Sequence, residues 1–219
     1  MTTRFPDAWL DTVRAISDPG AEEGAPTWPQ TARWQQVQNR EHARRVPPRY
    51  TDAATDLDEI YRWALAVLGD PRTAPSLLLV GPTGTGKTHT AYAALRLLSE
   101  SRRSTVAWRA ASTAVFFGDQ RPRPGQSGHD SEGAFERYAK APVLLLDDLG
   151  ATKNTEWTEE ALYRLVDHRY THCLPSIFTT NVPPAGLGER LGERIASRLT
   201  EMCRQVALIG DDRRKAGAR

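Results

Sequence analysis

The sequence is poor in cysteine, in net charge and in long apolar runs. Its 219 residues include two cysteines, Cys173 and Cys203, far apart and without a second pair nearby, so neither a disulfide framework nor a zinc site is supported. No apolar run approaches the length of a membrane span, and the N-terminus lacks a positively charged segment followed by an apolar signal core. These absences predict a cytoplasmic protein.

A net charge of +2 is too small to indicate nucleic-acid binding by itself, so any such function must depend on local clusters. Hydrophobic residues make up 39% of the chain and charged residues 26%, which is typical of a folded globular protein. The length suits one domain with a modest appendage.

The stretch from residue 77 to residue 88 has the pattern of a phosphate cradle. An apolar, strand-like run leads into G-x-x-x-x-G-K-T and then into an amphipathic helix, which is the context this motif requires. Its glycines allow successive N–H groups to turn inward onto phosphate oxygens, and the helix start adds the positive end of its dipole. Lys87 is expected to reach the β- and γ-phosphates, and Thr88 to bind Mg²⁺. The predicted cradle consists of Gly81, Pro82, Thr83, Gly84, Thr85, Gly86, Lys87 and Thr88.

Apolar runs alternate with amphipathic stretches along most of the chain. The predicted strands are 77–80, 105–108, 143–148, 175–180 and 205–209. The predicted helices are 56–68, 131–140, 156–172 and 187–202, with another starting near Lys87. This alternation predicts an α/β fold with a doubly wound parallel sheet. A segment rich in Pro, Gly and Arg, 118–128, is interpreted as a surface loop.

Polar side chains follow two of these strands. Asp147 and Asp148 end a fully apolar strand, and Asn181 ends another. Since ligands bind outside the carboxyl ends of parallel strands, we expect these residues and the cradle to meet at one edge of the sheet. Asp147 is then predicted to hold Mg²⁺ through water, and Asp148 to orient or deprotonate the attacking water. Asn181 either bonds the γ-phosphate or that water, or serves the turn before Pro183.

Two further regions leave alternatives open. Arg109, Arg121 and Arg123, with Arg102 and Arg103 upstream, form either a basic patch for single-stranded nucleic acid or an ordinary solvated loop. Residues 1–50 contain tryptophans and too few aliphatic residues for a core of their own. Those tryptophans, Trp9, Trp28 and Trp34, either pack on the main domain or anchor a partner protein.

Four motifs, GPTGTGKT, LLLDDLG, FTTN and LGERIASRL, occur in an order that resembles the AAA+ helicase loaders and transposition helper ATPases of the DnaC/IstB type. The resemblance covers about Pro47 to Arg214. It implies an AAA+ core without a C-terminal lid domain, with 51–219 as the ATPase domain and 1–50 as a helical partner-binding segment. It also implies ATP as the nucleotide.

The resemblance assigns roles to four further positions. Asn181 takes the sensor 1 position, and Arg214 falls where such loaders have a sensor 2 arginine. Arg194 and Arg198 fall in the box VII motif, and Arg198 is expected to be the arginine finger. Because a finger acts only near a neighbour's γ-phosphate, this role implies self-assembly.

The implied function is an ATP-dependent loader that holds single-stranded DNA and delivers a replicative helicase. The alternatives are a transposition helper with a transposase as partner and a non-catalytic DNA-binding adaptor that uses ATP as a structural ligand. A small-molecule phosphotransferase is disfavoured, because it needs a second substrate pocket and an arginine-bearing lid.

Overall fold

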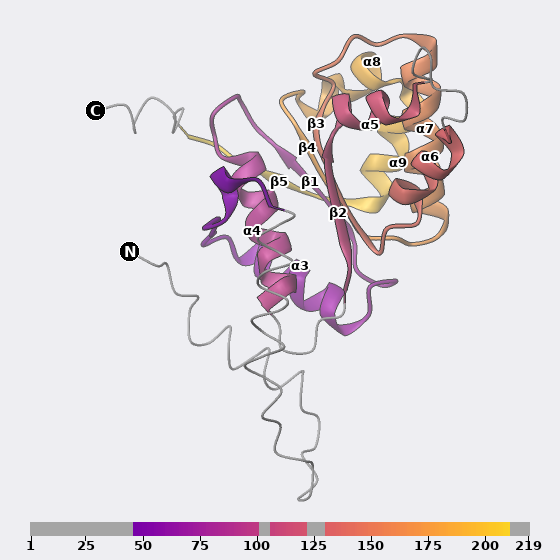
Figure 1. Cartoon of the computed structure of the whole chain (residues 1–219). Helices are drawn as coiled ribbons and strands as arrows, with labels where there is room; N and C mark the ends of the chain where they lie inside the picture. The colour runs from indigo at the N-terminus through magenta and orange to yellow at the C-terminus, as the bar shows by residue number, and fades with distance from the viewer. Residues whose placement is uncertain (1–45, 101–105, 122–129, 211–219) are drawn as a thin grey trace, which may run out of the picture.

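The computed structural model describes residues 46–100, 106–121 and 130–210. Within them, five parallel strands form one sheet in the order β2-β3-β4-β1-β5 (Figure 1). The central strands are apolar and buried, as expected for a sheet that is covered on both faces. The strands are β1 (Ser76–Val80), β2 (Trp108–Ser112), β3 (Val143–Leu149), β4 (Ser176–Thr180) and β5 (Cys203–Ala207).

Helices cover both faces of this sheet and enclose two apolar cores (Figure 1). One core lies beneath α3 (Asp58–Gly69) and α4 (Lys87–Glu100). The other lies beneath the remaining helices. These are α5 (Thr113–Gln120), α6 (Ser131–Ala139), α7 (Glu156–Thr171), α8 (Leu187–Leu191) and α9 (Glu193–Met202). Two 3₁₀ helices, η1 (Pro48–Tyr50) and η2 (Pro184–Gly186), complete the described elements. The doubly wound parallel sheet predicted from the sequence is therefore confirmed.

The strand order places β1 beside β4 and β4 beside β3. In this register Thr180 of β4 lies opposite Val80 of β1 on one side and Leu149 of β3 on the other. The segments that follow these three strands therefore emerge at one edge of the sheet. None of the described helices is long and apolar enough to cross a membrane.

Several element boundaries differ from the prediction. The second strand begins at Trp108, where it was expected to end, and β5 begins at Cys203 rather than at Gln205. The segment 118–120, interpreted as loop, is the end of α5. Arg123, Arg214 and the N-terminal tryptophans lie outside the described residues.

The predicted helix 187–202 is two helices, α8 and α9, that meet at Gly192. Gly192 has a φ of 96°, and a Cβ there would lie 2.3 Å from Oε1 of Glu159 on α7. Only glycine combines that backbone conformation with such a close approach. The break changes the direction of the chain, so α9 packs along α7 and presents its polar residues beside that helix.

Candidate functional site

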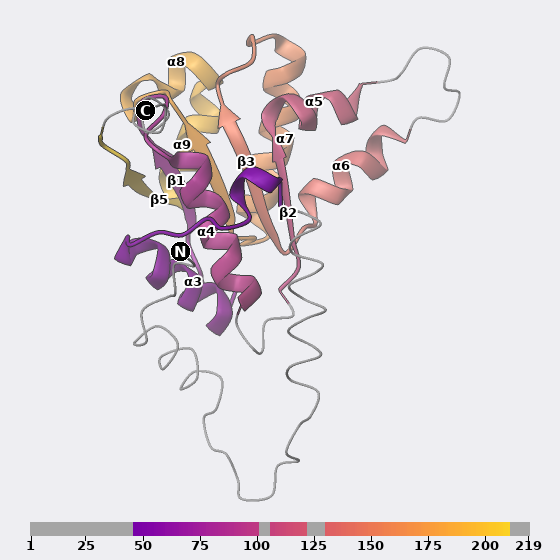
Figure 2. The same cartoon turned by 60° about the vertical axis from the view of Figure 1, so that its left-hand side comes forward.

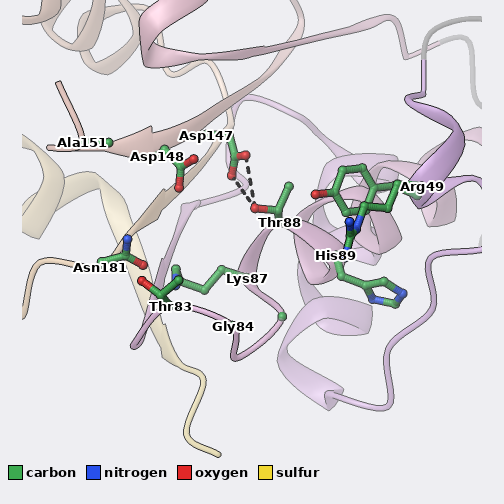
Figure 3. A pocket seen from close by; sticks show the side chains of 12 residues that line it. Arg49, Thr83, Gly84, Lys87, Thr88, His89, Asp147, Asp148, Ala151 and Asn181 are labelled. Atoms are coloured by element: carbon green, nitrogen blue, oxygen red, sulfur yellow. Dashed lines mark hydrogen bonds between the residues drawn. The ribbon is translucent and has the colours of Figure 1, made fainter. Parts of the chain in front are cut away.

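A cavity of about 660 Å³ opens at the carboxyl ends of the central strands (Figure 3). Its wall combines the glycine-rich loop after β1 with the carboxylates of β3 and the residue that follows β4 (Figure 3). The predicted residues that line it are Thr83, Gly84, Gly86, Lys87, Thr88, Asp147, Asp148 and Asn181. The structure thus brings together the three segments that the sequence places at this edge.

The loop after β1 owes its shape to its glycines. Gly84 and Gly86 have φ values of 88° and 96°, and a Cβ on Gly81 would lie 2.2 Å from the carbonyl oxygen of Leu208. These conformations let the loop curl tightly into α4, which begins at Lys87. The positive end of the α4 dipole therefore faces the cavity and favours an anion there.

Lys87 lies inside this loop with only 6% of its surface exposed. Its Nζ donates to the carbonyl oxygens of Gly81 and Pro82 at 2.8 and 2.7 Å. The loop backbone therefore positions the ammonium group at the floor of the cavity. Burial of a charge among oriented main-chain dipoles is typical of a group kept for binding an anion.

Asp147 lies between two threonines. The Thr88 hydroxyl donates to its two carboxylate oxygens at 3.0 and 3.1 Å, and the Thr179 hydroxyl donates to Oδ1 at 2.6 Å. Burial raises the pKa of Asp147 and the neighbouring Asp148 charge raises it further, while the two hydroxyl donors and Lys87 lower it. Thr88 and Asp147 thus place hard oxygen atoms in contact beside the phosphate loop.

Asp148 adopts a left-handed backbone conformation, with a φ of 61°. The register between β3 and β4 shifts between Leu146 and Leu149, so Asp148 lies on a bulge. Its N–H donates to the Thr179 hydroxyl at 2.9 Å, which holds the bulge in place. The side chain is directed to the cavity near Asn181 (Figure 3). A strained residue that its surroundings hold in place is characteristic of a functional site.

The two predicted box VII arginines do not reach this cavity. Arg194 lies over the ring of Tyr163, with its Cζ 4.3 Å from the centroid. Arg198 lies over Tyr170 at the same distance, and its Nε donates to Asp167 Oδ1 at 3.2 Å. Both arginines therefore project from α9 onto α7, outside the wall of the chain's own cavity.

Comparison with known families identifies the fold. Residues 48–218 match the family described as IstB-like ATP-binding protein. The chain belongs to this family. The match includes all four motifs quoted above, and it confirms their resemblance to the DnaC/IstB type. A search of curated proteins gives no match to this chain.

Solved structures resemble this IstB-like protein along most of the described domain. The crystal structure of the DnaC helicase loader is 25% identical, with a TM-score of 0.60 over 74% of this chain and 100% of that one. The DnaI structure is 22% identical, with a TM-score of 0.62 over 77% and 94% of the two chains. The replication initiator DnaA bound to AMPPCP and single-stranded DNA is 19% identical, with a TM-score of 0.60 over 75% and 51%. The likenesses to DnaI and DnaA, at 22% and 19% identity, concern the fold alone.

The residues of this IstB-like protein fit a magnesium ion. The described residues hold no group of three or more His, Cys, Asp or Glu side chains that could bind a metal on their own. They do offer the hydroxyl of Thr88 and the carboxylate of Asp147 in contact. Such a sparse oxygen pair suits Mg²⁺, which keeps several waters and completes its shell with substrate phosphates.

Some cavity residues were missed by the sequence reasoning. Arg49, Tyr50 and His89 line the cavity beside α4. The Tyr50 ring stacks on Tyr92 of α4 with centroids 4.8 Å apart and planes 11° apart, and burial raises the pKa of Tyr92 to about 12. Pro47 and Pro48 directly precede Arg49, and they start the 3₁₀ turn that brings Tyr50 to the cavity.

Two other supporting residues were also missed. Thr179 bonds Asp147 and the Asp148 backbone, and a signal for it was available, because it is a polar residue near the end of β4, directly after the apolar Ile177 and Phe178. Arg190 of α8 donates to the carbonyl oxygens of Gly150 and Thr152. These hydrogen bonds hold in place the segment that follows Asp148. Nothing in the local sequence indicates that distant partner.

Proposed function

We propose that this protein is an ATPase that binds single-stranded DNA and delivers a replicative helicase to it. One observation carries the ATPase proposal: Lys87, Thr88, Asp147, Asp148 and Asn181 meet around one cavity. The likeness to DnaC supports the loader role, because the matched structure is named as a helicase loader and is covered over its full length.

The cavity has a place for each part of the nucleotide. The loop N–H groups, the start of α4 and Lys87 would hold the phosphates, while Thr88 and Asp147 would hold Mg²⁺. When bound, Mg²⁺ neutralises charge on the phosphate oxygens. The wall formed by Arg49, Tyr50 and His89 would contact the base or ribose, because it flanks the cavity beside α4.

Asp148 and Asn181 would act on the attacking water. Asp148 is exposed to the cavity and carries no hydrogen bond through its carboxylate to any described residue, so it is free to accept from a water. Asn181 lines the same cavity and can donate to the water or to the γ-phosphate. We assign Arg214 to the nucleotide as a sensor 2 arginine; this role is based on the family resemblance.

Arg198 and Arg194 would act on a neighbouring subunit. Both lie outside the cavity of their own chain, on the side of α9 that faces α7, where Arg194 is exposed and Arg198 is about one third exposed. A finger stabilises transition-state charge only when it is close to the γ-phosphate, so this arrangement favours subunits that complete each other's sites. The proposed working form is thus a self-assembled ATPase.

Single-stranded DNA would contact Trp157 and Arg121. Trp157, at the start of α7, is 39% exposed, and the Arg121 guanidinium lies 5.1 Å from its ring centroid. An exposed aromatic ring beside a cation provides both stacking for a base and charge for a phosphate. This arrangement supports the nucleic-acid alternative for the basic loop.

We expect Trp157→Ala to weaken binding of fluorescein-labelled oligo(dT) by about 5- to 150-fold, since stacking contributes about 1–3 kcal/mol per base. Trp157→Phe keeps a ring and should retain most of the affinity. Val115 of α5 is also an exposed apolar residue, and Val115→Ala provides a matched control. Fluorescence anisotropy measures all four proteins. Equal affinity of Trp157→Ala and wild type would contradict a stacking role.

The family match favours one second candidate, a transposition helper with the same ATPase chemistry. The two functions differ only in the partner, so the test is competitive capture. The tagged Asp148→Asn variant, which should hold ATP without turnover, is incubated with purified replicative helicase and with transposase from the same host. We expect ATP-dependent retention of the helicase. Retention of the transposase alone would establish the helper role instead.

A further inference from the structure

The end of α6 lies beside the beginning of β2 (Figure 2). A second cavity, of about 530 Å³, is lined by residues of these two segments and of the connection to β3. We call it the β2–α6 groove. It is far from the nucleotide, because its walls come from the beginnings of β2 and β3, whereas the nucleotide cavity is at their carboxyl ends. The groove is lined by Ala107, Trp108, Arg109, Ala110, Glu136, Arg137, Lys140, Ala141 and Pro142.

Positive charge dominates this groove. Its wall has three cationic side chains and one carboxylate, and that carboxylate, Glu136, is already paired with Lys140 at 2.6 Å. No carboxylate in the described part of the chain pairs with Arg109 or Arg137. The Arg109 guanidinium instead lies 5.3 Å from the Tyr138 ring centroid. Two guanidinium groups thus face one cavity, and neither forms an ion pair with a carboxylate of the described residues.

The groove is a firmly built feature rather than a loose surface. Arg169 of α7 is fully buried and donates to the carbonyl oxygens of Tyr138, Ala139 and Ala141 at 2.8–3.1 Å. These bonds fix the end of α6 and the connection to β3. Tyr138 is itself held by a 2.6 Å hydrogen bond to Asp119 of α5. The backbone that carries Arg137 and Lys140 is therefore preorganised before any ligand arrives.

The cationic side chains of the groove come from two elements that meet at its wall. Arg109 comes from β2, which pairs with β3 alone among the described strands, while Arg137 and Lys140 come from the end of α6. Guanidinium and ammonium groups are the usual side-chain ligands of nucleic-acid phosphates. An apolar floor of alanines and Trp108 leaves room for sugars between them.

We propose that the β2–α6 groove binds the phosphate backbone of single-stranded nucleic acid. The inference builds on the proposed DNA-binding function and adds a second contact to it. Trp157 lines a small cavity with Ser131 and Glu132 at the beginning of α6, and the groove lies at the end of the same helix. A nine-residue helix is about 14 Å long, so one strand can cover both. The groove would then set how long a stretch of DNA each subunit holds.

The test measures the salt dependence of oligo(dT) binding by the full-length protein. Arg109→Ala/Arg137→Ala removes two phosphate contacts, so the slope of log affinity against log salt should fall by about 1.4. Between 50 and 200 mM salt the loss of affinity should then be about 7-fold smaller than for wild type. Arg137→Ala/Lys140→Ala removes two exposed charges and should act in the same direction without touching Tyr138.

The matched control is Arg72→Ala/Arg204→Ala, which also removes two exposed arginines. Arg72 lies in the turn between α3 and β1, and Arg204 lies on β5, at the edge of the sheet opposite β2. It should leave the slope within about 0.3 of wild type. All variants should keep basal ATP hydrolysis, because the groove is remote from the nucleotide cavity. A photoreactive 4-thiothymidine oligonucleotide should cross-link to residues 107–110 or 136–142 in wild type.

Three results would overturn the proposal, and they can be told apart. If wild type binds DNA and both groove variants keep its slope, the groove is not a DNA contact and the proposed function stands. If a poly-glutamate peptide binds the groove and the DNA slope is unaffected, the groove takes acidic peptides instead. If wild type binds no single-stranded DNA even at low salt, both the groove proposal and the proposed DNA function fail.

Discussion

Lys87→Ala should abolish ATP binding, whereas Asp148→Asn should leave binding intact and lower hydrolysis by about 10²–10⁴-fold. The two residues lie in one cavity and have different surroundings. Lys87 is buried in the phosphate loop and held by two carbonyl oxygens. Asp148 is exposed to the cavity, near the end of β3. Loss of Lys87 removes the positive charge that faces the phosphates. Loss of the Asp148 carboxylate removes a hydrogen-bond acceptor for the attacking water.

Asparagine is the appropriate substitution at position 148 for a structural reason. Asp148 has a φ of 61°, which asparagine adopts at low cost and alanine does not. Asp148→Asn therefore removes the charge and preserves the bulge, and a thermal unfolding midpoint close to that of wild type would verify this. A loss of hydrolysis in Asp148→Ala would have two causes, the missing carboxylate and the strained backbone, which the measurement could not separate.

The measurements are fluorescence of an N-methylanthraniloyl ATP analogue for binding and phosphate release for hydrolysis. Asp147→Asn provides a second control, because Asp147 accepts from Thr88 and Thr179 and is assigned to Mg²⁺. It should weaken nucleotide binding with Mg²⁺ present more than without it. If Lys87→Ala and Asp148→Asn lose binding equally, Asp148 does not have the water-orienting role.

Sequence reasoning predicted the convergence of the site because that convergence follows from topology. Parallel strands end at the same edge, so the loop after β1, the acids after the apolar part of β3 and Asn181 had to lie close together. It did not predict the bulge at Asp148. The bulge depends on Thr179, whose hydroxyl bonds both Asp147 and the Asp148 backbone from the next strand. Such a contact between strands has no local pattern.

The other misses also come from tertiary contacts that override local pattern. The periodicity of 187–202 is continuous, yet Gly192 breaks the helix where the chain passes close to Glu159. Tyr50 follows two prolines that indicate a turn, and only its stack on Tyr92 shows that it belongs to the cavity. Arg169 has a helical position like any other exposed arginine, but it is fully buried among carbonyl oxygens. In each case the deciding partner is distant in sequence.

Mixing two inactive variants should restore hydrolysis if Arg198 acts on a neighbouring subunit. Lys87→Ala has an intact Arg198 but no usable site, and Arg198→Ala has an intact site but no finger. Each alone should be nearly inactive. Mixed assemblies contain some subunit interfaces, or junctions, in which an intact Arg198 of one subunit faces an intact ATP site of the next. Since a finger contributes about 10³-fold or more in rate, even a minority of such junctions should give a clear signal.

The position of Arg198 makes this test interpretable. Its guanidinium lies over Tyr170 and pairs with Asp167 outside its own cavity, and both partners of that pair are about one third exposed. Such a surface pair contributes only about 0–1 kcal/mol, so Arg198→Ala should fold normally and its inactivity should reflect the missing finger. The mixture of Arg198→Ala with the double variant Lys87→Ala/Arg198→Ala is the control, because it contains no finger and should stay inactive.

Analytical ultracentrifugation must first show that Lys87→Ala still associates with Arg198→Ala. Once mixed assemblies are present, hydrolysis that rises with the fraction of Lys87→Ala, passes through a maximum and falls again identifies a contact across subunits. A mixture that assembles without recovering activity would exclude Arg198 as the finger. Arg194 lies one helical turn before it, over Tyr163, and would then be tested by the same mixing.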